Sequence, residues 1–260
     1  MTLDRTTEPQ GTLWLDAPDW SQFDDVVQRG EPWALWPVGF QSVLAHWMDE
    51  AVRRNVERVK IISPDRPDLL EQRLKGGIFW SREVAVHATA PSDAPAQRSS
   101  LAALPGQTDF AAPTTGGELL RYWLKVQMDW LQSRNEKVSL DRQLHPRVWV
   151  GPGVVIHPQA RLTGPCWIGS RSQIGADSVI GPNAIIGTHS VIDRNASVSD
   201  SVVMPDTFIG SNLHLKHMIA DGECLLDCTR DSRVQIVDRF MMARLQPSIW
   251  SWLTGRRRRP

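Results

Sequence analysis

Aliphatic residues recur at an unbroken spacing of six through the centre of the chain. They occupy nine successive sixth positions: Val150, Ile156, Leu162, Ile168, Ile174, Ile180, Ile186, Ile192 and Val198. A period of six fits neither the 3.6-residue repeat of an α-helix nor the two-residue alternation of a free strand. It predicts a parallel β-helix, in which three hexads form one triangular coil and successive coils stack about 4.8 Å apart.

The repeat changes phase once, near Ser201. Val203, Ile209 and Leu215 then resume the step of six, which predicts a one-residue deletion and a fourth coil. We expect the β-helix to span 145–240, with a closing strand at 234–240 and an amphipathic, basic tail at 241–260. No insertion interrupts 150–202.

The first part of the chain alternates strand-like and helix-like segments instead. The predicted strands are 12–15, 33–39, 56–62 and 84–86, and the predicted helices are 20–27, 43–54 and 67–74. This order predicts a small parallel α/β domain over 11–88. The following segment, 89–117, is rich in Ala, Pro, Ser, Thr and Gly and predicts a linker. Apolar spacing over 118–134 predicts a connecting helix that covers the open end of the β-helix.

Composition narrows the classes of function. The 260 residues carry 29 basic and 29 acidic side chains, and this balance argues against broad nucleic-acid binding. Cys166, Cys224 and Cys228 have neither a disulfide-framework spacing nor a metal-ligand spacing, so no metal and no cofactor is expected. An N-terminus without an apolar core and the lack of an 18-residue apolar run predict a cytoplasmic protein.

The hexad run resembles the hexapeptide-repeat proteins, whose β-helix is left-handed. That group includes acyltransferases and sugar nucleotidyltransferases that carry the β-helix as a C-terminal domain. The sequence Trp36-Pro37-Val38-Gly39, with the helix and strand after it, resembles the part of sugar nucleotidyltransferases that follows their phosphate loop. Residues 207–226 are similar to the tail of nucleotidyltransferase-like proteins of bacterial exopolysaccharide clusters. The resemblance implies an α/β + β protein: a small, reduced nucleotidyltransferase-like domain followed by a left-handed parallel β-helix.

This sequence differs from that family in the segments that carry out catalysis. Residues 1–35 contain no G-x-G-x-R loop to hold phosphates. Trp33 stands where the family has a lysine, and the linker replaces the stretch that supplies the magnesium-binding aspartates. We therefore expect a protein of surface-polysaccharide biosynthesis that lacks nucleotidyl transfer and acts as a scaffold or regulator. Two alternatives stay open: a hexapeptide-repeat acyltransferase that modifies a sugar, and a sugar-1-phosphate nucleotidyltransferase that is still active. If it is an enzyme, it is a transferase.

Histidines are the candidate bases for acyl transfer. His189 occupies an outward position on a coil and is the candidate catalytic residue. His157, His214 and His217 are further candidates, although isolated histidines on a coil are most often surface residues. The carboxylates Asp193, Asp200 and Asp206 receive no predicted role.

The C-terminus combines aromatic and basic residues. The candidates for membrane or partner contact are Trp250, Trp252, Arg256, Arg257, Arg258 and Arg259. Such a combination favours peripheral attachment to an anionic membrane surface, here the inner face, or to a membrane-associated sugar transferase. The flat faces of a β-helix predict a homo-oligomer, with a trimer favoured.

Overall fold

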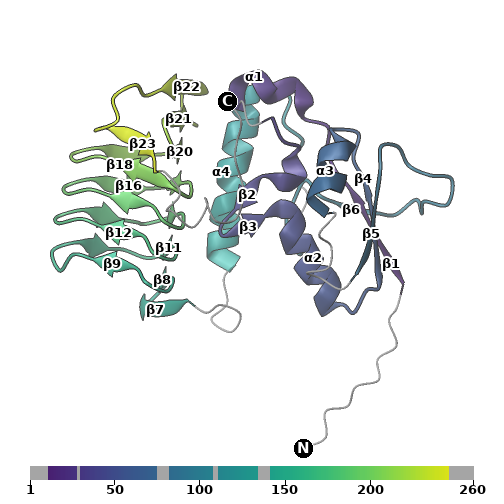
Figure 1. Cartoon of the computed structure of the whole chain (residues 1–260), viewed down its shortest axis with the longest axis horizontal. Helices are drawn as coiled ribbons and strands as arrows, with labels where there is room; N and C mark the ends of the chain where they lie inside the picture. Colours follow the sequence, from purple (N-terminus) through teal and green to yellow (C-terminus); the bar gives the residue numbers. More distant parts are fainter. Residues whose placement is uncertain (1–10, 28–29, 75–81, 108–110, 134–140, 246–260) are drawn as a thin grey trace, which may run out of the picture. The chain divides into compact units, whose positions relative to one another are not determined.

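The computed structural model describes residues 11–27, 30–74, 82–107, 111–133 and 141–245 (Figure 1). The chain divides into an N-terminal unit, 1–115, and a C-terminal unit, 116–260. Each unit is described by itself. No helix in the described ranges is both long and apolar enough to cross a membrane.

The N-terminal unit is built on a four-stranded parallel sheet. Its elements are β1 (Thr12–Asp16), η1 (Ser21–Phe23), α1 (Asp24–Val27), η2 (Trp33–Leu35), β2 (Pro37–Val38), β3 (Gln41–Ser42), α2 (Val43–Arg53), β4 (Arg58–Ile62), α3 (Pro67–Leu74), β5 (Glu83–His87) and β6 (Ser99–Ser100). The sheet order is β5-β4-β1-β6. The parallel α/β layer predicted for this part of the chain is confirmed.

Local sequence explains the helices of this unit. The side chain of Ser42 caps α2 by accepting a hydrogen bond from Ala45 N at 3.2 Å. Pro67 begins α3, where its missing N–H costs nothing. Most apolar side chains of α2 are buried, with Val43 and Met48 at 0% exposure, whereas Val52 is 41% exposed.

The predicted strand over 33–39 is only partly right, because the strand is limited to Pro37–Val38. Trp33–Leu35 forms the short helix η2, and β2 pairs only with β3, in an antiparallel hairpin outside the main sheet. Gly39 makes the turn with φ +61°, a conformation that glycine adopts without strain. Trp33 is 1% exposed, and its Nε1 donates to Leu101 O at 2.9 Å. Burial of the indole, rather than strand pairing, therefore decides the path of this segment.

The predicted linker, 89–117, is also partly wrong. Ser99 and Ser100 form β6 and pair with the end of β1. Leu101 is fully buried, and Trp47 Nε1 donates to Ala103 O at 2.8 Å. Residues 99–104 therefore complete the sheet and core of the N-terminal unit.

The C-terminal unit begins with helix α4 (Gly116–Ser133) and continues as a β-helix. Its strands are β7 (Arg142–His145), β8 (Val148–Val150), β9 (Val155–Ile156), β10 (Arg161–Leu162), β11 (Cys166–Ile168), β12 (Gln173–Ile174), β13 (Val179–Ile180), β14 (Ala184–Ile186), β15 (Val191–Ile192), β16 (Ser197–Ser199), β17 (Ser201–Val203), β18 (Thr207–Ile209), β19 (His214–Lys216), β20 (Met218–Asp221), β21 (Cys224–Asp227), β22 (Ser232–Gln235) and β23 (Met242–Arg244). They form three sheets: β22-β21-β20-β17-β14-β11-β8-β7, β23-β18-β15-β12-β9 and β10-β13-β16-β19.

The coil register follows the hexads. Ile186 pairs with Ile168, eighteen residues earlier, and Ile168 pairs with Val150 in the same way. The next step is seventeen residues, from Ile186 to Val203, as the phase change near Ser201 predicts. The aliphatic residues of this register form one buried core. The predicted parallel β-helix in the C-terminal part is confirmed.

Buried hydroxyl groups line one corner of the coils. Ser190 Oγ donates to Met204 O at 2.9 Å, and Ser172 Oγ accepts from Ser190 N at 3.2 Å. Thr207 continues the ladder in the next coil and accepts from Gly222 N at 2.9 Å. All three side chains are fully buried, so the hydroxyls satisfy backbone groups that the corner takes out of water.

The last coil ends differently from the prediction. Strand β22 ends at Gln235, so a closing strand over 234–240 is wrong beyond that residue. The chain then turns, and β23 pairs antiparallel with β18. Met242 is 1% exposed within the β-helix core. Residues 242–244 therefore belong to the β-helix and not to the tail.

Helix α4 lies along a side face of the β-helix, and not over its open end as predicted (Figure 1). The eight-stranded sheet carries a column of apolar residues on its outer face. Each is next in sequence to a residue that points into the coil: Trp149, Trp167, Ile185, Val202 and Ile219. All are buried. Trp130 of α4 packs edge-on against Trp167 at 5.5 Å between ring centroids, and Leu120 O lies 3.7 Å from Cys228 Sγ. The apolar column thus explains why the helix lies along this face.

Candidate functional site

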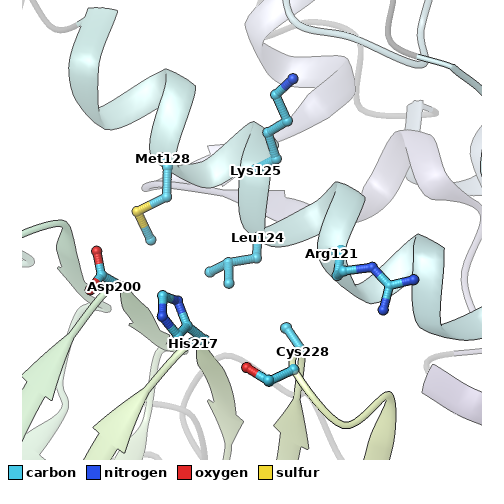
Figure 2. Close-up of a pocket in the computed structure, with 8 residues that line it drawn as sticks. Arg121, Leu124, Lys125, Met128, Asp200, His217 and Cys228 are labelled. Carbon is cyan, nitrogen blue, oxygen red and sulfur yellow. The ribbon is translucent and has the colours of Figure 1, made fainter.

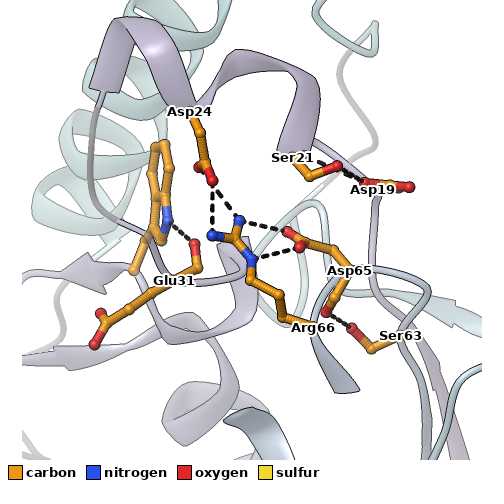
Figure 3. A network of polar contacts seen from close by, with 8 residues as sticks. Asp19, Ser21, Asp24, Glu31, Ser63, Asp65 and Arg66 are labelled. Carbon is orange, nitrogen blue, oxygen red and sulfur yellow. Dashed lines mark hydrogen bonds and ion pairs between the residues drawn. The ribbon is translucent and has the colours of Figure 1, made fainter. Parts of the chain in front are cut away.

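The carboxyl edge of the N-terminal sheet is the first place to look for a ligand site, because open parallel sheets bind ligands there. Figure 3 shows Arg66, just beyond β4, between two carboxylates. Its Nη1 donates to Asp24 Oδ2 at 2.7 Å and its Nε to Asp65 Oδ1 at 2.6 Å. The hydrogen bond with Asp65, followed by that with Asp24, raises the pKa of Arg66. The Asp65 side chain is 2% exposed, so this ion pair is a built part of the fold.

Other charged side chains at this edge also have hydrogen-bond partners within the protein. Arg98 Nε donates to Asp16 Oδ2, at the end of β1, at 2.7 Å. Asp19 accepts from the Ser21 hydroxyl at 2.7 Å. Three carboxylates, those of Asp16, Asp24 and Asp65, are thus paired with two guanidinium groups, and the carboxylate of Asp19 adds a further negative charge. Such an edge repels phosphate groups.

The Trp-Pro-Val-Gly segment that carried the family resemblance contacts a partly buried histidine, His46. His46 Nε2 lies 3.0 Å from Val38 O, and its Nδ1 lies 3.0 Å from Gln41 Nε2. This pattern fits a neutral ring that donates to Val38 O and accepts from the Gln41 amide. Burial lowers the pKa of His46 from its ordinary value of 6.5. The segment positions the hairpin and contributes no group suited to phosphate transfer.

His46 predicts a pH dependence of stability. A histidine held neutral by burial contributes stability that is present above its unfolded pKa, about 6.5, and is lost as the pH falls through the lower folded pKa. We expect the free energy of unfolding to decrease below pH 6.5, and the decrease to be smaller in His46→Gln. Urea denaturation followed by tryptophan fluorescence measures this, with His157→Gln, an exposed histidine, as the control. Equal pH slopes for the wild type and His46→Gln would contradict the assignment.

A second candidate is a pocket of the C-terminal unit between α4 and the β-helix (Figure 2). Its volume is about 620 Å³. The residues that line it are Arg121, Leu124, Lys125, Met128, Asp200, His217, Cys228 and Thr229. The first four lie on one face of α4, at the three- and four-residue spacing that brings helix side chains together.

The charged groups of this pocket already have partners. Arg121 forms an ion pair with Asp231, and Asp200 Oδ1 accepts from Asn183 Nδ2 at 2.8 Å. Burial raises the pKa of the Cys228 thiol to about 12, so it stays protonated and is a poor nucleophile. The pocket therefore offers a partly apolar surface at Leu124 and Met128 and no activated nucleophile.

The structure does not bring the candidate histidines together. His189 lies at a coil corner with φ +58°, is 33% exposed, and has its Nδ1 3.5 Å from Asp206 Oδ1. His214 contacts Ser197 Oγ at 2.7 Å on the four-stranded sheet, and His217 lines the pocket. His157 is exposed on the first coil. Only His189 has a carboxylate partner that could orient its ring.

The other residues named in the sequence analysis either contact neighbouring parts of the β-helix or lie outside the residues that the structure describes. Asp193 and Asp200 accept hydrogen bonds from Ser211 and Asn183 of neighbouring coils, and Asp206 Oδ1 lies 3.5 Å from His189 Nδ1. Cys166 is in the β-helix core. Among the described residues, no cluster of three or more His, Cys, Asp or Glu could hold a metal ion. The tail residues Trp250, Trp252, Arg256, Arg257, Arg258 and Arg259 lie outside the described residues.

Comparisons with known proteins agree with the fold of the C-terminal part. Residues 162–230 match the family model "GMPPB C-terminal domain". Among solved structures the chain is similar to a mutant of perosamine N-acetyltransferase from Caulobacter crescentus, crystallised with CoA and GDP-perosamine. That match has 11% identity and a TM-score of 0.16 and covers 82% of this chain and 94% of that chain, and at this TM-score it carries no argument. No curated protein matches the chain.

These findings define a class. The C-terminal unit is a parallel β-helix built on six-residue repeats, and residues 162–230 within it resemble the GMPPB C-terminal domain.

Proposed function

We propose that the protein is a nucleotidyltransferase-like component of surface-polysaccharide biosynthesis that does not itself transfer nucleotides and acts as a scaffold or regulator. The observation that carries the proposal is the Asp24–Arg66–Asp65 ion-pair network at the carboxyl edge of the N-terminal sheet. The similarity of 162–230 to the GMPPB C-terminal domain supports the link to sugar nucleotides.

The physical argument concerns charge. Nucleotidyl transfer requires positioned cations, and commonly a metal ion, to stabilise charge on the phosphates. At this edge, Arg66 and Arg98 are already bound to carboxylates of the protein. A triphosphate would have to displace those carboxylates and remain beside them. We therefore expect the N-terminal unit to have the α/β fold but not to catalyse nucleotidyl transfer.

A scaffold needs surfaces that bind other chains. We propose that the β-helix associates with copies of itself, as a trimer, and with a membrane-associated sugar transferase on the cytoplasmic side. Sedimentation of the full chain and cross-linking in cell membranes test these two assemblies separately. A monomer at all concentrations would exclude the first, and cross-links confined to soluble proteins would exclude the second.

The catalytic part of the proposal is tested with the full chain, nucleoside triphosphates, sugar 1-phosphates and magnesium. We expect no pyrophosphate release above the rate without protein and no thermal shift with any of these ligands. A ligand at a hundred times its dissociation constant would stabilise the protein by about 2.7 kcal/mol, which a melting curve detects. Pyrophosphate release that depends on the protein would overturn the proposal and favour an active nucleotidyltransferase.

Acyl transfer is the second candidate, favoured by the His189–Asp206 contact at 3.5 Å. A carboxylate that holds Nδ1 leaves Nε2 of the same ring free to act as a base. This reading predicts that acetyl-CoA stabilises the protein, that a nucleotide sugar is acetylated, and that His189→Asn abolishes the acetylation. His157→Asn is the matched control. No acetylation by the wild type would remove this candidate.

A further inference from the structure

The first coil of the β-helix, 148–165, lies at one end of the coil stack (Figure 1). Among the described residues, β7 covers only β8, whereas β9 and β10 are the last strands of their sheets and pair on one side only. The burial of the inward residues follows this difference. Val150 of β8 is 4% exposed, but Ile156 of β9 and Leu162 of β10 are only partly buried.

The opposite end of the stack is closed by the chain itself. Strand β23 pairs with β18, and β20, β21 and β22 extend the eight-stranded sheet beyond β17. The inward residues Ile209 and Leu215 of the last coil are 0% and 4% exposed. Coil ends need covering, because an uncovered coil presents apolar side chains and unpaired backbone groups. Within the described residues, the protein thus covers one end and leaves two strands of the other end open.

Arginines surround the open end. The stretch 142–176 contains no Asp or Glu, and the carboxylate just before it, that of Asp141, accepts from Trp167 Nε1 at 2.8 Å. The four arginines of this stretch are Arg142, Arg147, Arg161 and Arg171. All four are exposed, and none forms an ion pair or side-chain hydrogen bond in the described structure. The open end therefore presents four guanidinium groups that are available to an anionic partner.

Two of these arginines lie beside β10. Arg161 is the exposed residue of this strand and is next in sequence to the inward Leu162. Arg147 lies at the turn that follows β10, because its O accepts from Cys166 N at 2.9 Å and a Cβ on Gly164 would lie 3.0 Å from Arg147 Cβ. The free edge of β10 thus combines unpaired backbone groups, a partly buried aliphatic side chain and two cations.

A strand of another protein satisfies all three features at once. Its backbone pairs with the free edge of β10, and its side chains alternate between two faces. An apolar residue of such a strand covers Leu162, and the neighbouring acidic residue lies opposite Arg161, where unlike charges stabilise a cross-strand pair. A nucleic acid would supply phosphates to the arginines but no aliphatic side chain to cover Leu162.

Charge argues against a second copy of this chain as the occupant. Two first coils placed end to end would bring like charges together. Carboxylates near the opposite end of the stack are already paired, Asp221 with Arg244 and Asp231 with Arg121. The complementary surface therefore belongs to a different, acidic protein.

We propose that the free edge of β10 binds an acidic segment of a partner protein, which adds to the sheet as a further strand. Apolar residues of that segment cover Leu162, and its carboxylates pair with Arg161 and Arg147. The inference goes beyond the proposed function and does not rest on it, because this binding requires no nucleotide and no sugar.

The test uses a fluorescent peptide of alternating valine and glutamate, with fluorescence anisotropy of the full chain at low and at physiological salt. Wild type should bind the peptide, and more weakly as salt rises. The double variant Arg147→Gln, Arg161→Gln should bind about tenfold more weakly. The matched control is Arg194→Gln, Arg239→Gln, which removes two exposed arginines elsewhere on the same unit and should change binding by less than about twofold.

Two modified peptides test strand pairing separately from charge. One carries N-methyl groups on the valines and the other on the glutamates. A strand pairs with one neighbour through alternate residues, so one of these peptides should bind and the other should not. Equal binding of the two would show that the peptide does not add to the sheet, and the proposal would fail.

Three further outcomes would overturn the proposal. The first is negligible binding of the wild type to the valine–glutamate peptide at low salt. The second is an equal loss of binding in the control variant, which would assign the effect to net charge and not to β10. The third is tighter binding of polyuridylate than of the peptide, lost in the Arg147→Gln, Arg161→Gln variant, which would make the open end a nucleic-acid surface.

Discussion

An aspartate in place of Ile186 is expected to prevent the β-helix from folding. Ile186 is fully buried in a central coil, with Ile168 below it and Val203 above it in the register. An unpaired carboxylate in an apolar interior costs several kcal/mol even after its pKa shifts. That cost is comparable with the total stability of a domain, about 5–15 kcal/mol. Circular dichroism and limited proteolysis of the purified full chain should show loss of the β-helix.

Two milder variants make the expectation quantitative. Ile186→Ala removes side-chain volume without adding charge and should lower the free energy of unfolding by about 2–5 kcal/mol, as measured by urea denaturation. Val155→Asp places the same charge on an outward position that is 63% exposed and should change stability by less than about 0.5 kcal/mol. An Ile186→Asp protein with the wild-type unfolding midpoint would mean that this residue does not point into the coil.

The coil register was predictable because one physical requirement repeats at every turn. Each hexad must place one aliphatic side chain inward, so the sequence shows the period directly. The seventeen-residue step from Ile186 to Val203 was predictable for the same reason, since a single deletion shifts the phase of every later hexad.

The position of α4 was not predicted, although the sequence contains evidence for it. Trp149, Trp167 and Ile185 recur at a step of eighteen, each beside an inward residue. An outward apolar column cannot face water, so it predicts a covering element on that sheet. The inward aliphatic residues alone do not predict this column, because they define the core of the coil and not its outer faces.

In the N-terminal unit, the sequence predicts the local elements but not the contacts between distant segments. Its strands and helices follow from local patterns such as the Ser42 cap and the Pro67 start. The path of 99–104 does not, because it depends on hydrogen bonds from Trp33 and Trp47, more than fifty residues earlier. A segment rich in small residues and proline looks like a linker in composition even when distant indoles fix it in place.

The candidate sites join residues that are distant in sequence for the same reason. Arg121 meets Asp231, 110 residues later, and Arg66 meets Asp24, 42 residues earlier. The sequence shows directly that the phosphate loop is absent. It does not show that two carboxylates form ion pairs with Arg66, because no short motif contains all three residues.

Replacing Arg66 by methionine is expected to destabilise the N-terminal unit by about 3 kcal/mol. The change leaves the Asp65 carboxylate, 2% exposed, without the guanidinium group that now holds it at 2.6 Å. Removing one partner of a fully buried pair costs about 3–5 kcal/mol. We expect the lower end of that range because the Arg66 side chain is 26% exposed and water can partly replace it. Urea denaturation followed by tryptophan fluorescence measures the loss.

Arg73→Met is the matched control, because it also removes an arginine that bonds a carboxylate. Arg73 Nη2 lies 2.8 Å from Glu31 Oε1, but its side chain is 52% exposed, so its loss should cost at most about 1 kcal/mol. Equal effects of the two variants would show that Asp65 is stable without Arg66, and that the network is not a fixed part of the fold. The arginine would then be available to an anionic ligand, and the argument from a closed carboxyl edge would fail with it.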